Sequence, residues 1–296
     1  MTAEPAPRGL FVGLTTLDVV HVLDDLPRRD EKLTAREQFV AAGGPAANAA
    51  VTFAALGGRS VLHTALGSHP AAAIAQAELV GCGVDVRDAD PARASALPVS
   101  AVRVEAATGL RSVSSADSVG PSPPAPARFD DADVLLVDGH WSALAVAATR
   151  WARDRSVPVL VDAGRPRPVF AELFGAADLV VASSDYWPDP TEAALRAGAD
   201  AVAVTDGPRP VRWATVDGVG TVAVPPVTAV DTAGAGDVFH GAVAYAVGRV
   251  GWPTAVALLP QVLAFAVAVA GVRVAHPGPR AWLRDPRLGE LAARWN

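Results

Sequence analysis

A glycine-rich turn, DTAGAGDVFHGA, occupies residues 231–242 in a stretch that is otherwise rich in alanine and valine. The small residues Gly234, Ala235 and Gly236 let the backbone approach a ligand closely where a hydrophobic helix is predicted to begin. The N–H groups and the positive dipole end at the start of a helix favour an anion. The turn is not a P-loop, because GxxxxGK[ST] is absent, and its glycine spacing does not match the dinucleotide motif GxGxxG. We therefore interpret it as an anion hole of another kind.

Asp237 follows this turn, and its carboxylate cannot itself help to hold an anion. A hydroxyl that attacks a phosphoryl group loses its proton as the new bond forms, and an aspartate within hydrogen-bond reach can accept that proton. The neighbouring amides would stabilise the transferring charge. The alternative is that Asp237 only complements the dipole in the first turn of the helix.

Composition excludes several classes of protein. The chain has 296 residues, 51% of them apolar and 19% charged, with a formal net charge of −6. This favours a globular α/β protein and argues against a nucleic-acid partner, which would need a basic surface. The single cysteine, Cys82, favours a reducing, cytoplasmic setting. The N-terminus lacks the pattern of an export signal, and Pro260 interrupts the apolar region at 257–274, so we expect a buried helix there and no membrane span.

Short apolar runs alternate with helical patterns along most of the chain, which predicts a doubly wound, mostly parallel sheet flanked by helices. The predicted strands include LFVGL, SVLHTALG, GVDVRDA, DVLLVDG, PVLVDAG, DLVVAS and AVAVTDG, and extended segments are expected from GTVAVPP to the approach of Asp231. The predicted helices include residues 45–58, 71–80 and 168–174, SALAVAATRWARD, TEAALRAG, and most of the chain from Ala233 to about Gly271.

Two segments interrupt this alternation, at about 15–42 and 98–116. The second contains two alternating stretches around a turn at 107–109, which predicts an antiparallel hairpin. Ligands in open α/β sheets bind at the carboxyl ends of the strands, so a small sheet made of these segments would form a lid over the site. We expect one domain over residues 1–296, and a homodimer through the exposed lid edges.

Four stretches together resemble the ribokinase-like (PfkB) carbohydrate kinases. VDTAGAGDVFHGA resembles the family signature, GLTTLD at 13–18 its first strand and sugar-binding aspartate, AAGGPAANAA at 41–50 its other signature, and GVDV at 83–86 its third strand. GLTTLDVVHVLDDLP and ELFGAADLVVAS are similar to ketohexokinase. GGPAANAA, GDVFHGA and HPGPRA at 276–281 are similar to sulfofructose kinase and other fructokinase-like members.

The resemblance implies an ATP-dependent kinase that transfers the γ-phosphate to a hydroxyl of a ketose-type or related small sugar, with ATP and Mg²⁺ as cofactors. It leaves open whether a monovalent cation assists. It implies catalytic roles for Asp237 and the turn Gly234, Ala235 and Gly236; substrate binding by Thr16, Asp18, Lys32, Gly44, Asn48, Arg111 and His140; and nucleotide binding by Thr205, Gly207, Thr232, Gly234 and Gly236. Without it, Asp18 would be a turn residue, Asn48 a polar residue at a helix start, and Lys32 and Arg111 solvated surface charges.

The chain departs from the family pattern in three places. His140 stands where both similar branches carry an arginine, which argues against a sulfonate or phosphate on the substrate. The metal-associated NxxE pattern is replaced by SSDYWPDP, in which Asp185 is the nearest carboxylate, so the metal ligands are unknown. The nucleotide motif TxGxxG keeps only Thr205 and Gly207.

Two further residues have competing interpretations. Trp141 could line a sugar pocket or lie in the core. Helical spacing directs His240 behind Asp237, which favours a structural role. For the protein as a whole, the alternatives are a nucleoside kinase of the same family and a sugar- or nucleotide-binding protein with little turnover. A dinucleotide oxidoreductase is excluded, because the glycine turn lies late in the chain instead of after the first strand.

Overall fold

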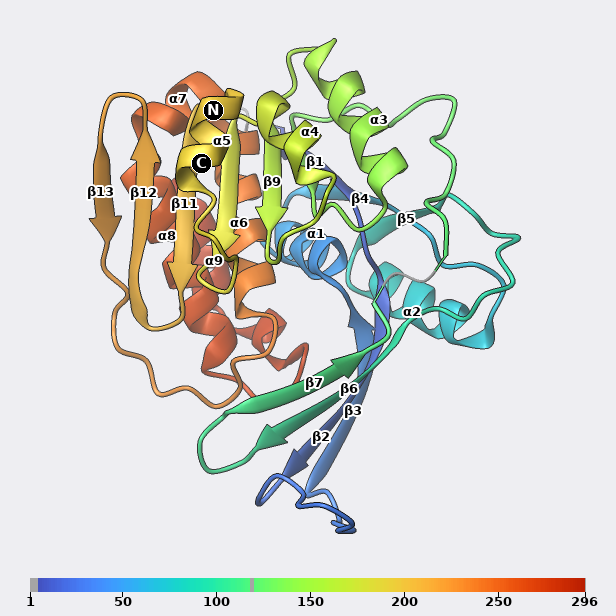
Figure 1. The fold of residues 1–296 in the computed structure, drawn as a ribbon. Helices are drawn as coiled ribbons and strands as arrows, with labels where there is room; N and C mark the ends of the chain where they lie inside the picture. Colours follow the sequence, from blue (N-terminus) through green and yellow to red (C-terminus); the bar gives the residue numbers. More distant parts are fainter. Residues whose placement is uncertain (1–4, 118–119, 296) are drawn as a thin grey trace.

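A large sheet forms the centre of the computed structural model, which describes residues 5–117 and 120–295 (Figure 1). Within these residues the sheet has nine strands, in the order β13-β12-β11-β10-β9-β8-β1-β4-β5. Their bounds are β1 Arg8–Val12, β4 Arg59–Thr64, β5 Val84–Asp88, β8 Val134–Val137, β9 Val159–Ala163, β10 Leu179–Ser183, β11 Ala201–Asp206, β12 Arg209–Thr215 and β13 Val219–Val222.

Neighbouring strands from β5 to β11 run parallel, and β12 and β13 add an antiparallel edge. The chain winds from β1 to one side through β4 and β5, then returns to the other side of β1 at β8. Such a reversal opens a crevice at the carboxyl ends of the strands. The predicted doubly wound, mostly parallel sheet is confirmed, and the crevice beside β1 and β8 is the expected place for a ligand.

Helices cover both faces of this sheet and bury two hydrophobic cores (Figure 1). Leu10 and Val12 of β1 belong to one core and Phe11 to the other, because successive strand residues point to opposite faces. One face is covered by α1 Pro45–Ala55, α2 Pro70–Gly81, α6 Ala235–Val250, α7 Trp252–Ala257, α8 Leu259–Val274 and α9 Arg287–Ala292, and the other by α3 Ser142–Arg153, α4 Phe170–Leu173 and α5 Thr191–Ala197.

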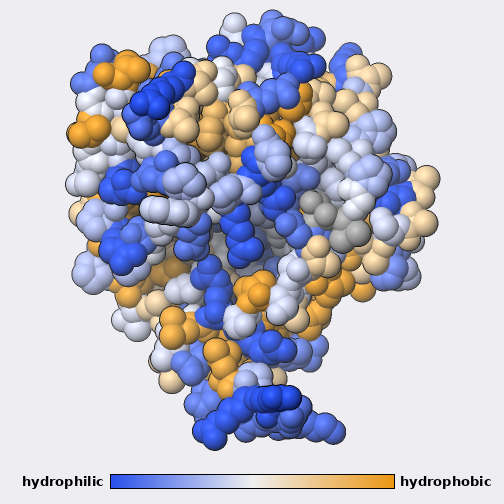
Figure 2. Space-filling model, viewed as in Figure 1, coloured by the Kyte–Doolittle hydropathy of each residue, from blue (hydrophilic) through white to orange (hydrophobic). Residues whose placement is uncertain are grey.

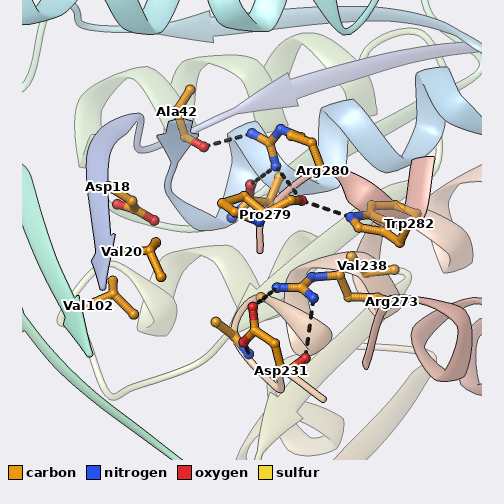
Figure 3. Close-up of a pocket in the computed structure, with 13 residues that line it drawn as sticks. Asp18, Val20, Ala42, Val102, Asp231, Val238, Arg273, Pro279, Arg280 and Trp282 are labelled. Atoms are coloured by element: carbon orange, nitrogen blue, oxygen red, sulfur yellow. Dashed lines mark hydrogen bonds and ion pairs between the residues drawn. The ribbon is translucent and has the colours of Figure 1, made fainter. Parts of the chain in front are cut away.

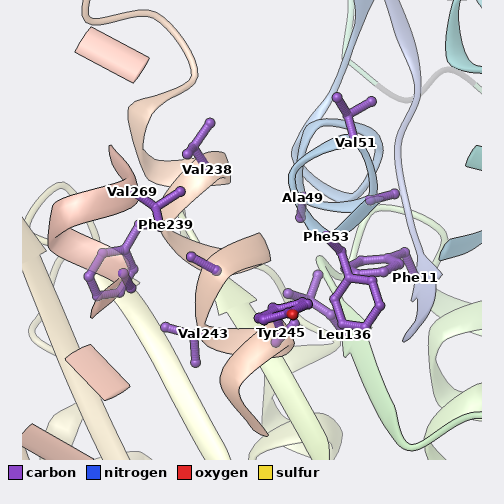
Figure 4. Packing of buried hydrophobic residues seen from close by; sticks show 14 of the residues in the cluster. Phe11, Ala49, Val51, Phe53, Leu136, Val238, Phe239, Val243, Tyr245 and Val269 are labelled. Carbon is purple, nitrogen blue, oxygen red and sulfur yellow. The ribbon is translucent and has the colours of Figure 1, made fainter. Parts of the chain in front are cut away.

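Helices α1 and α6 pack against each other at close range, and aromatic side chains fill the space below them (Figure 4). A Cβ atom at Gly241 would lie 2.4 Å from the carbonyl oxygen of Ala49, so only glycine fits at this contact. Phe53 stacks edge-on between Phe11 and Tyr245, with ring centroids 5.4 and 5.7 Å apart. Gly241, the last glycine of GDVFHGA, therefore lets α6 pack closely against α1. This contact brings the N-terminal turns of the two helices side by side.

A second sheet projects from the main body (Figure 1). Its strands lie in the order β3-β2-β6-β7, with bounds β2 Thr16–Leu23, β3 Glu37–Gly43, β6 Val99–Glu105 and β7 Arg111–Ser115. The β6–β7 pair is the predicted antiparallel hairpin, whereas the parallel pairing of β2 with β6 was not predicted. The turn between β2 and β3, DDLPRRDEKLTAR, forms the hydrophilic tip of this sheet (Figure 2).

The structure differs from the sequence predictions in two segments. The predicted helix at 168–174 contains one α-helical turn, α4, followed by a 3₁₀ turn over Phe174–Ala176. The predicted extended approach to Asp231 contains no strand after β13 among the described residues, because Pro225 and Pro226 cannot donate to a ladder. The helical region after Ala233 is confirmed as α6 to α8. No helix in residues 5–117 and 120–295 has the length and apolarity to cross a membrane.

Candidate active site

A cavity lies between the small sheet and the start of α6 (Figure 3). Asp18, Val20 and Val102 line it from the small sheet, and Ala42 and Asn48 line it from the end of β3 and from α1. The glycine turn and the start of α6 add Asp231, Ala233, Gly234 and Val238 to the wall. The end of α8 and the segment after it add Arg273, Pro279, Arg280 and Trp282. Segments from both ends of the chain therefore enclose one space.

The glycine turn opens α6 as predicted, with Gly234 as the N-cap in the left-handed region at φ 71°. The N–H of Ala233 is held by the Asp231 carboxylate at 2.8 Å. Among residues 5–117 and 120–295, the N–H groups of Gly234, Gly236 and Asp237 have no hydrogen-bond acceptor. These free donors, at the positive end of a 16-residue helix, can bind an anion.

The lid hairpin touches this turn through Arg111. Its Nη1 donates to the carbonyl oxygen of Thr232 at 2.9 Å and to Thr232 Oγ1 at 3.0 Å. Thr232 Oγ1 in turn donates to the Gly109 carbonyl at 3.3 Å. A guanidinium from the small sheet thus lies beside the free amides, where it would add positive charge.

Asp237 lies in the first turn of α6, and Asn48 Nδ2 donates to its Oδ2 at 2.8 Å. Burial raises the pKa of Asp237, and the Asn48 hydrogen bond and the nearby His240 partly oppose that rise. A carboxylate with a raised pKa and one oxygen held by a single donor is suited to accept a proton. The helix-dipole interpretation remains compatible with the same position.

Asp18 lies on β2 at the other side of the cavity. Thr16 Oγ1 donates to its Oδ1 at 2.6 Å. Burial raises its pKa, while Thr16, Ser100 and Arg280 oppose the rise. The predicted residues Thr16, Asp18 and Asn48 are therefore brought together, and Asp237 joins them through Asn48. Gly44 is the N-cap of α1 and joins this group from the end of β3.

Asp138 is a structural centre of the site that sequence reasoning missed. It follows β8, is almost completely buried, and accepts the N–H groups of Leu14 at 2.8 Å, His140 at 3.0 Å and Ala46 at 3.1 Å. Burial alone would raise its pKa, but His140 and these hydrogen bonds lower it. One carboxylate thereby fixes the end of β1 against the start of α1. An acid directly after a buried parallel strand is a signal that could have found it.

His140 does not line the cavity; it belongs to a charged cluster beside Asp138. Its Nδ1 lies 3.1 Å from Asp138 Oδ1, and its Nε2 lies 2.6 Å from Arg167 Nη2 and 3.1 Å from Asp117 Oδ1. Burial would lower the pKa of His140, but Asp138 raises it above its ordinary value. Arg167, from the loop after β9, places a cation beside His140, and this cation is paired with Asp117 at 2.9 Å. Trp141 is 2% exposed and lies in the core.

Asp162 and His240 form a buried pair behind the anion hole. His240 Nδ1 lies 2.7 Å from the Gly236 carbonyl oxygen and 3.4 Å from Asp162 Oδ2. His240 points toward the sheet, as its spacing predicts. Burial raises the pKa of Asp162 to about 6, with His240 opposing the rise and Asp237 adding to it. Asp162 lies within the buried parallel strand β9, one residue before its end.

Two of the predicted nucleotide-binding residues, Thr205 and Gly207, lie at the end of β11, and the other three lie at the glycine turn. Thr205 Oγ1 donates to the Ala182 carbonyl at 3.3 Å, and Gly207 lies in the exposed turn between β11 and β12. Asp185 is exposed in the turn after β10. Lys32 lies on the exposed turn between β2 and β3, at the far end of the small sheet, so the structure does not bring it to the cavity. In the described part of the chain, no three His, Cys, Asp or Glu side chains form a metal cluster.

Comparisons with known proteins identify the family of the chain. The model of the pfkB family carbohydrate kinases matches residues 8–285. The chain is 30% identical over 249 residues to an ATP-dependent ribose-1-phosphate kinase from Halopiger xanaduensis, covering 78% of this chain and 82% of that protein. It is 26% identical over 266 residues to mouse ketohexokinase, covering 81% and 89%.

Solved structures show the same fold. A putative ribokinase from Agrobacterium tumefaciens has a TM-score of 0.82 at 23% identity, covering 98% of this chain and 99% of that one. Arabidopsis thaliana ribokinase complexed with ribose and ATP has a TM-score of 0.73 at 20% identity, covering 97% and 99%. The resemblance found in the sequence is thereby confirmed. The chain belongs to the pfkB family of carbohydrate kinases, phosphotransferases that use an alcohol group as acceptor.

Proposed function

We propose that the protein transfers the γ-phosphate of ATP to a hydroxyl of a ketose-type or related small sugar. The observation that carries this proposal is the hydrogen bond from Asn48 to Asp237, which joins the polar side of the cavity to the carboxylate at the anion hole. Asp18 and Asn48 would hold sugar hydroxyls, with Thr16 and Gly44 beside them. The reacting hydroxyl would then face Asp237.

In this mechanism Asp237 accepts the hydroxyl proton as the oxygen attacks phosphorus. The free N–H groups of Gly234, Gly236 and Asp237 would stabilise the three equatorial oxygens of the transferring group, with Arg111 adding charge from the lid. Most of the catalysis is positioning and electrostatic stabilisation. The small sheet would cover the cavity and exclude water that could otherwise attack ATP.

ATP is proposed as the phosphoryl donor, because a neighbouring structure is a ribokinase with ribose and ATP. Its polyphosphate would run from Thr205 and Gly207 toward Thr232 and the glycine turn. Mg²⁺ bound to the triphosphate would neutralise part of its charge. Within residues 5–117 and 120–295 no group of three His, Cys, Asp or Glu side chains could hold a metal ion, and no step here depends on a protein ligand to Mg²⁺.

A phosphorylated sugar is the second candidate acceptor. Arg167 reaches His140 and places a cation near the position where similar enzymes carry an arginine. The relative from Halopiger xanaduensis is a kinase of ribose 1-phosphate. Nucleosides are a third candidate acceptor, because they also offer a sugar hydroxyl for phosphoryl transfer.

We also propose a homodimer through the small sheet, in a cytoplasmic setting. Val40 and Val99, on the face of that sheet away from the cavity, are 48% and 44% exposed. A second copy could cover them, since exposed apolar patches on sheets favour association. Light scattering coupled to size exclusion would report the mass, and a monomer at micromolar concentration would contradict the dimer.

The function is tested by incubating the protein with ATP, Mg²⁺ and a panel of ketoses, aldoses, sugar phosphates and nucleosides, and measuring ADP release. We expect acceptor-dependent ADP release with a sugar of the panel. Asp237→Asn should lower kcat by about 10²- to 10⁴-fold with little change in ligand affinity. Ligand binding without ADP release from any acceptor would instead support a binding protein with little turnover.

A further inference from the structure

Arg280 lies at the cavity wall in the segment after α8 (Figure 3). Its guanidinium contacts three other parts of the chain. Nε donates to Glu78 Oε1 at 2.7 Å and Nη2 donates to Glu78 Oε2 at 3.2 Å. Nη2 also donates to the Ala42 carbonyl at 2.7 Å, and Nη1 donates to Asn48 Oδ1 at 3.1 Å. One planar cation therefore joins α2, the end of β3 and α1.

The contact with Asn48 determines which end of the Asn48 amide faces Asp237. With Oδ1 occupied by Arg280, Nδ2 points to the Asp237 carboxylate, where it donates at 2.8 Å. A reversed amide would place its NH₂ group against the guanidinium and its carbonyl oxygen against the carboxylate. Both contacts would be repulsive, because a guanidinium has no acceptor and a carboxylate has no donor.

The contact with Ala42 connects the same guanidinium to the root of the small sheet. Glu78 Oε2, already bound to Arg280, also accepts the N–H of Ala42 at 3.2 Å. The Arg280–Glu78 pair thus binds both backbone polar groups of Ala42, one residue before the end of β3. A displacement of β3 at Ala42 would therefore also move the guanidinium of Arg280, which orients Asn48.

We propose that Arg280 is a positioning residue, which fixes the Asn48 amide so that Asp237 stays aligned and which ties that alignment to the position of the small sheet. The assignment rests on the proposed kinase function. A purely structural ion pair is the competing interpretation, since the side chains of Arg280 and Glu78 are 20% and 22% exposed. The two interpretations differ in what they predict for pH dependence and for coupling to Asn48.

The test compares three variants: Arg280→Met, Arg280→Lys, and a double variant that carries both Arg280→Met and Glu78→Gln. The double variant leaves neither charge of the pair behind. Arg196→Met is the matched control, because Arg196 pairs with Glu192 on the exposed surface of α5. For Arg280→Met we expect kcat to fall about 10- to 100-fold, with KM for ATP within about 2-fold. Arg280→Lys should restore part of the loss, the double variant should not, and the control should match the wild type.

The pH profile of kcat is the second readout. When the Asn48 amide is free to turn, Asp237 loses a donor to its ionised form, so its pKa rises and the acid limb moves to higher pH. The other charged groups that act on Asp237 are present in wild type and variants alike; they are Asp18, Arg111, Asp162 and His240. Arg280 also acts on Asp18, and Asp18 acts on Asp237. The limb is therefore compared in the Asn48→Ala background as well, where a shift that comes from the amide disappears and a shift that comes from the lost charge persists.

A double-mutant cycle with Asn48→Ala completes the test. If Arg280 acts through Asn48, adding Arg280→Met to Asn48→Ala should change kcat less than about 2-fold. Additive effects, or a lower melting temperature with an unmoved acid limb, would overturn the assignment. A wild type that releases no ADP with any acceptor, or an Asp237→Asn variant as active as wild type, would overturn the proposed function and the assignment with it.

Discussion

Asn48 Nδ2 donates to Asp237 Oδ2 at 2.8 Å and joins two residues that are 189 positions apart in the sequence. Asp237 must be ionised to accept a proton, and burial already raises its pKa. The rate should therefore fall as pH falls through this raised pKa. Asn48→Ala removes the donor that favours the ionised form, so the acid limb of kcat should move to higher pH.

The measurement is kcat from pH 5 to pH 9 with saturating ATP and sugar. The ratio of wild-type to variant kcat should be larger at low pH than at high pH. Parallel profiles would contradict a role of this hydrogen bond in the ionisation of Asp237.

Gly43→Ala should disrupt the sugar side of the site. A Cβ atom at Gly43 would lie 2.1 Å from Asp18 Oδ2, so the carboxylate would have to move. We expect KM for the sugar to rise at least about 10-fold, since a displaced directional acceptor no longer meets its hydroxyl, while KM for ATP stays near wild type. Gly81→Ala is the control, because its added Cβ would have no atom within 4 Å apart from its chain neighbours and the nearby backbone of its own helix. An unchanged KM for the sugar would show that Asp18 does not bind it.

Asp231→Ala should destabilise the fold. Asp231 pairs with Arg273 at 2.9 Å, and both side chains are at most 4% exposed. Its removal leaves a buried guanidinium without its partner, which costs about 3–5 kcal/mol in the free energy of unfolding. Glu192→Ala breaks an exposed pair with Arg196 and should cost less than about 1 kcal/mol. Urea unfolding curves measure both values, and equal losses would contradict the distinction.

Asp162→Asn should stabilise the protein at alkaline pH. Because the folded-state pKa of Asp162 is about 6 and its ordinary value is 3.8, the folded state binds the proton more tightly than the unfolded state. The free energy of unfolding therefore falls as pH rises from about 4 through 6, by up to about 3 kcal/mol. Asp162→Asn has no carboxyl group to ionise, so its free energy of unfolding should not fall in this pH range.

Urea unfolding at pH 4 and pH 8 tests this prediction. The variant should be more stable than wild type at pH 8, with a smaller difference at pH 4. A difference that does not depend on pH would show that Asp162 keeps its ordinary pKa.

Local patterns predicted most of the architecture. Buried parallel strands such as VLLV and the start of VLVDA have continuous apolar runs, and the glycine turn at the start of α6 has the residues that a close approach requires. The parallel pairing of β2 with β6 was not predictable from either segment, because alternation fixes which face a residue occupies and leaves the choice of neighbour open.

The site was predictable only in part. Asp18 and Asn48 were found through family resemblance, whereas spacing alone gave each an ordinary structural role. The chemistry of the glycine turn already indicated Asp237 as a proton acceptor, with a helix-dipole role as the alternative. Arg280 and Asn48 lie 232 residues apart, and no local pattern in a single sequence encodes such a contact. The contact between Arg167 and His140 was missed for the same reason, because Arg167 reaches His140 from another loop.

The great separation between Asn48 and Asp237 also has a consequence for biosynthesis. A ribosome releases α1 nearly two hundred residues before the carboxylate, and Arg280 follows later still. Because a domain generally folds as a unit, the contacts that join Asn48 to Asp237 and Arg280 cannot form until residue 280 has been synthesised.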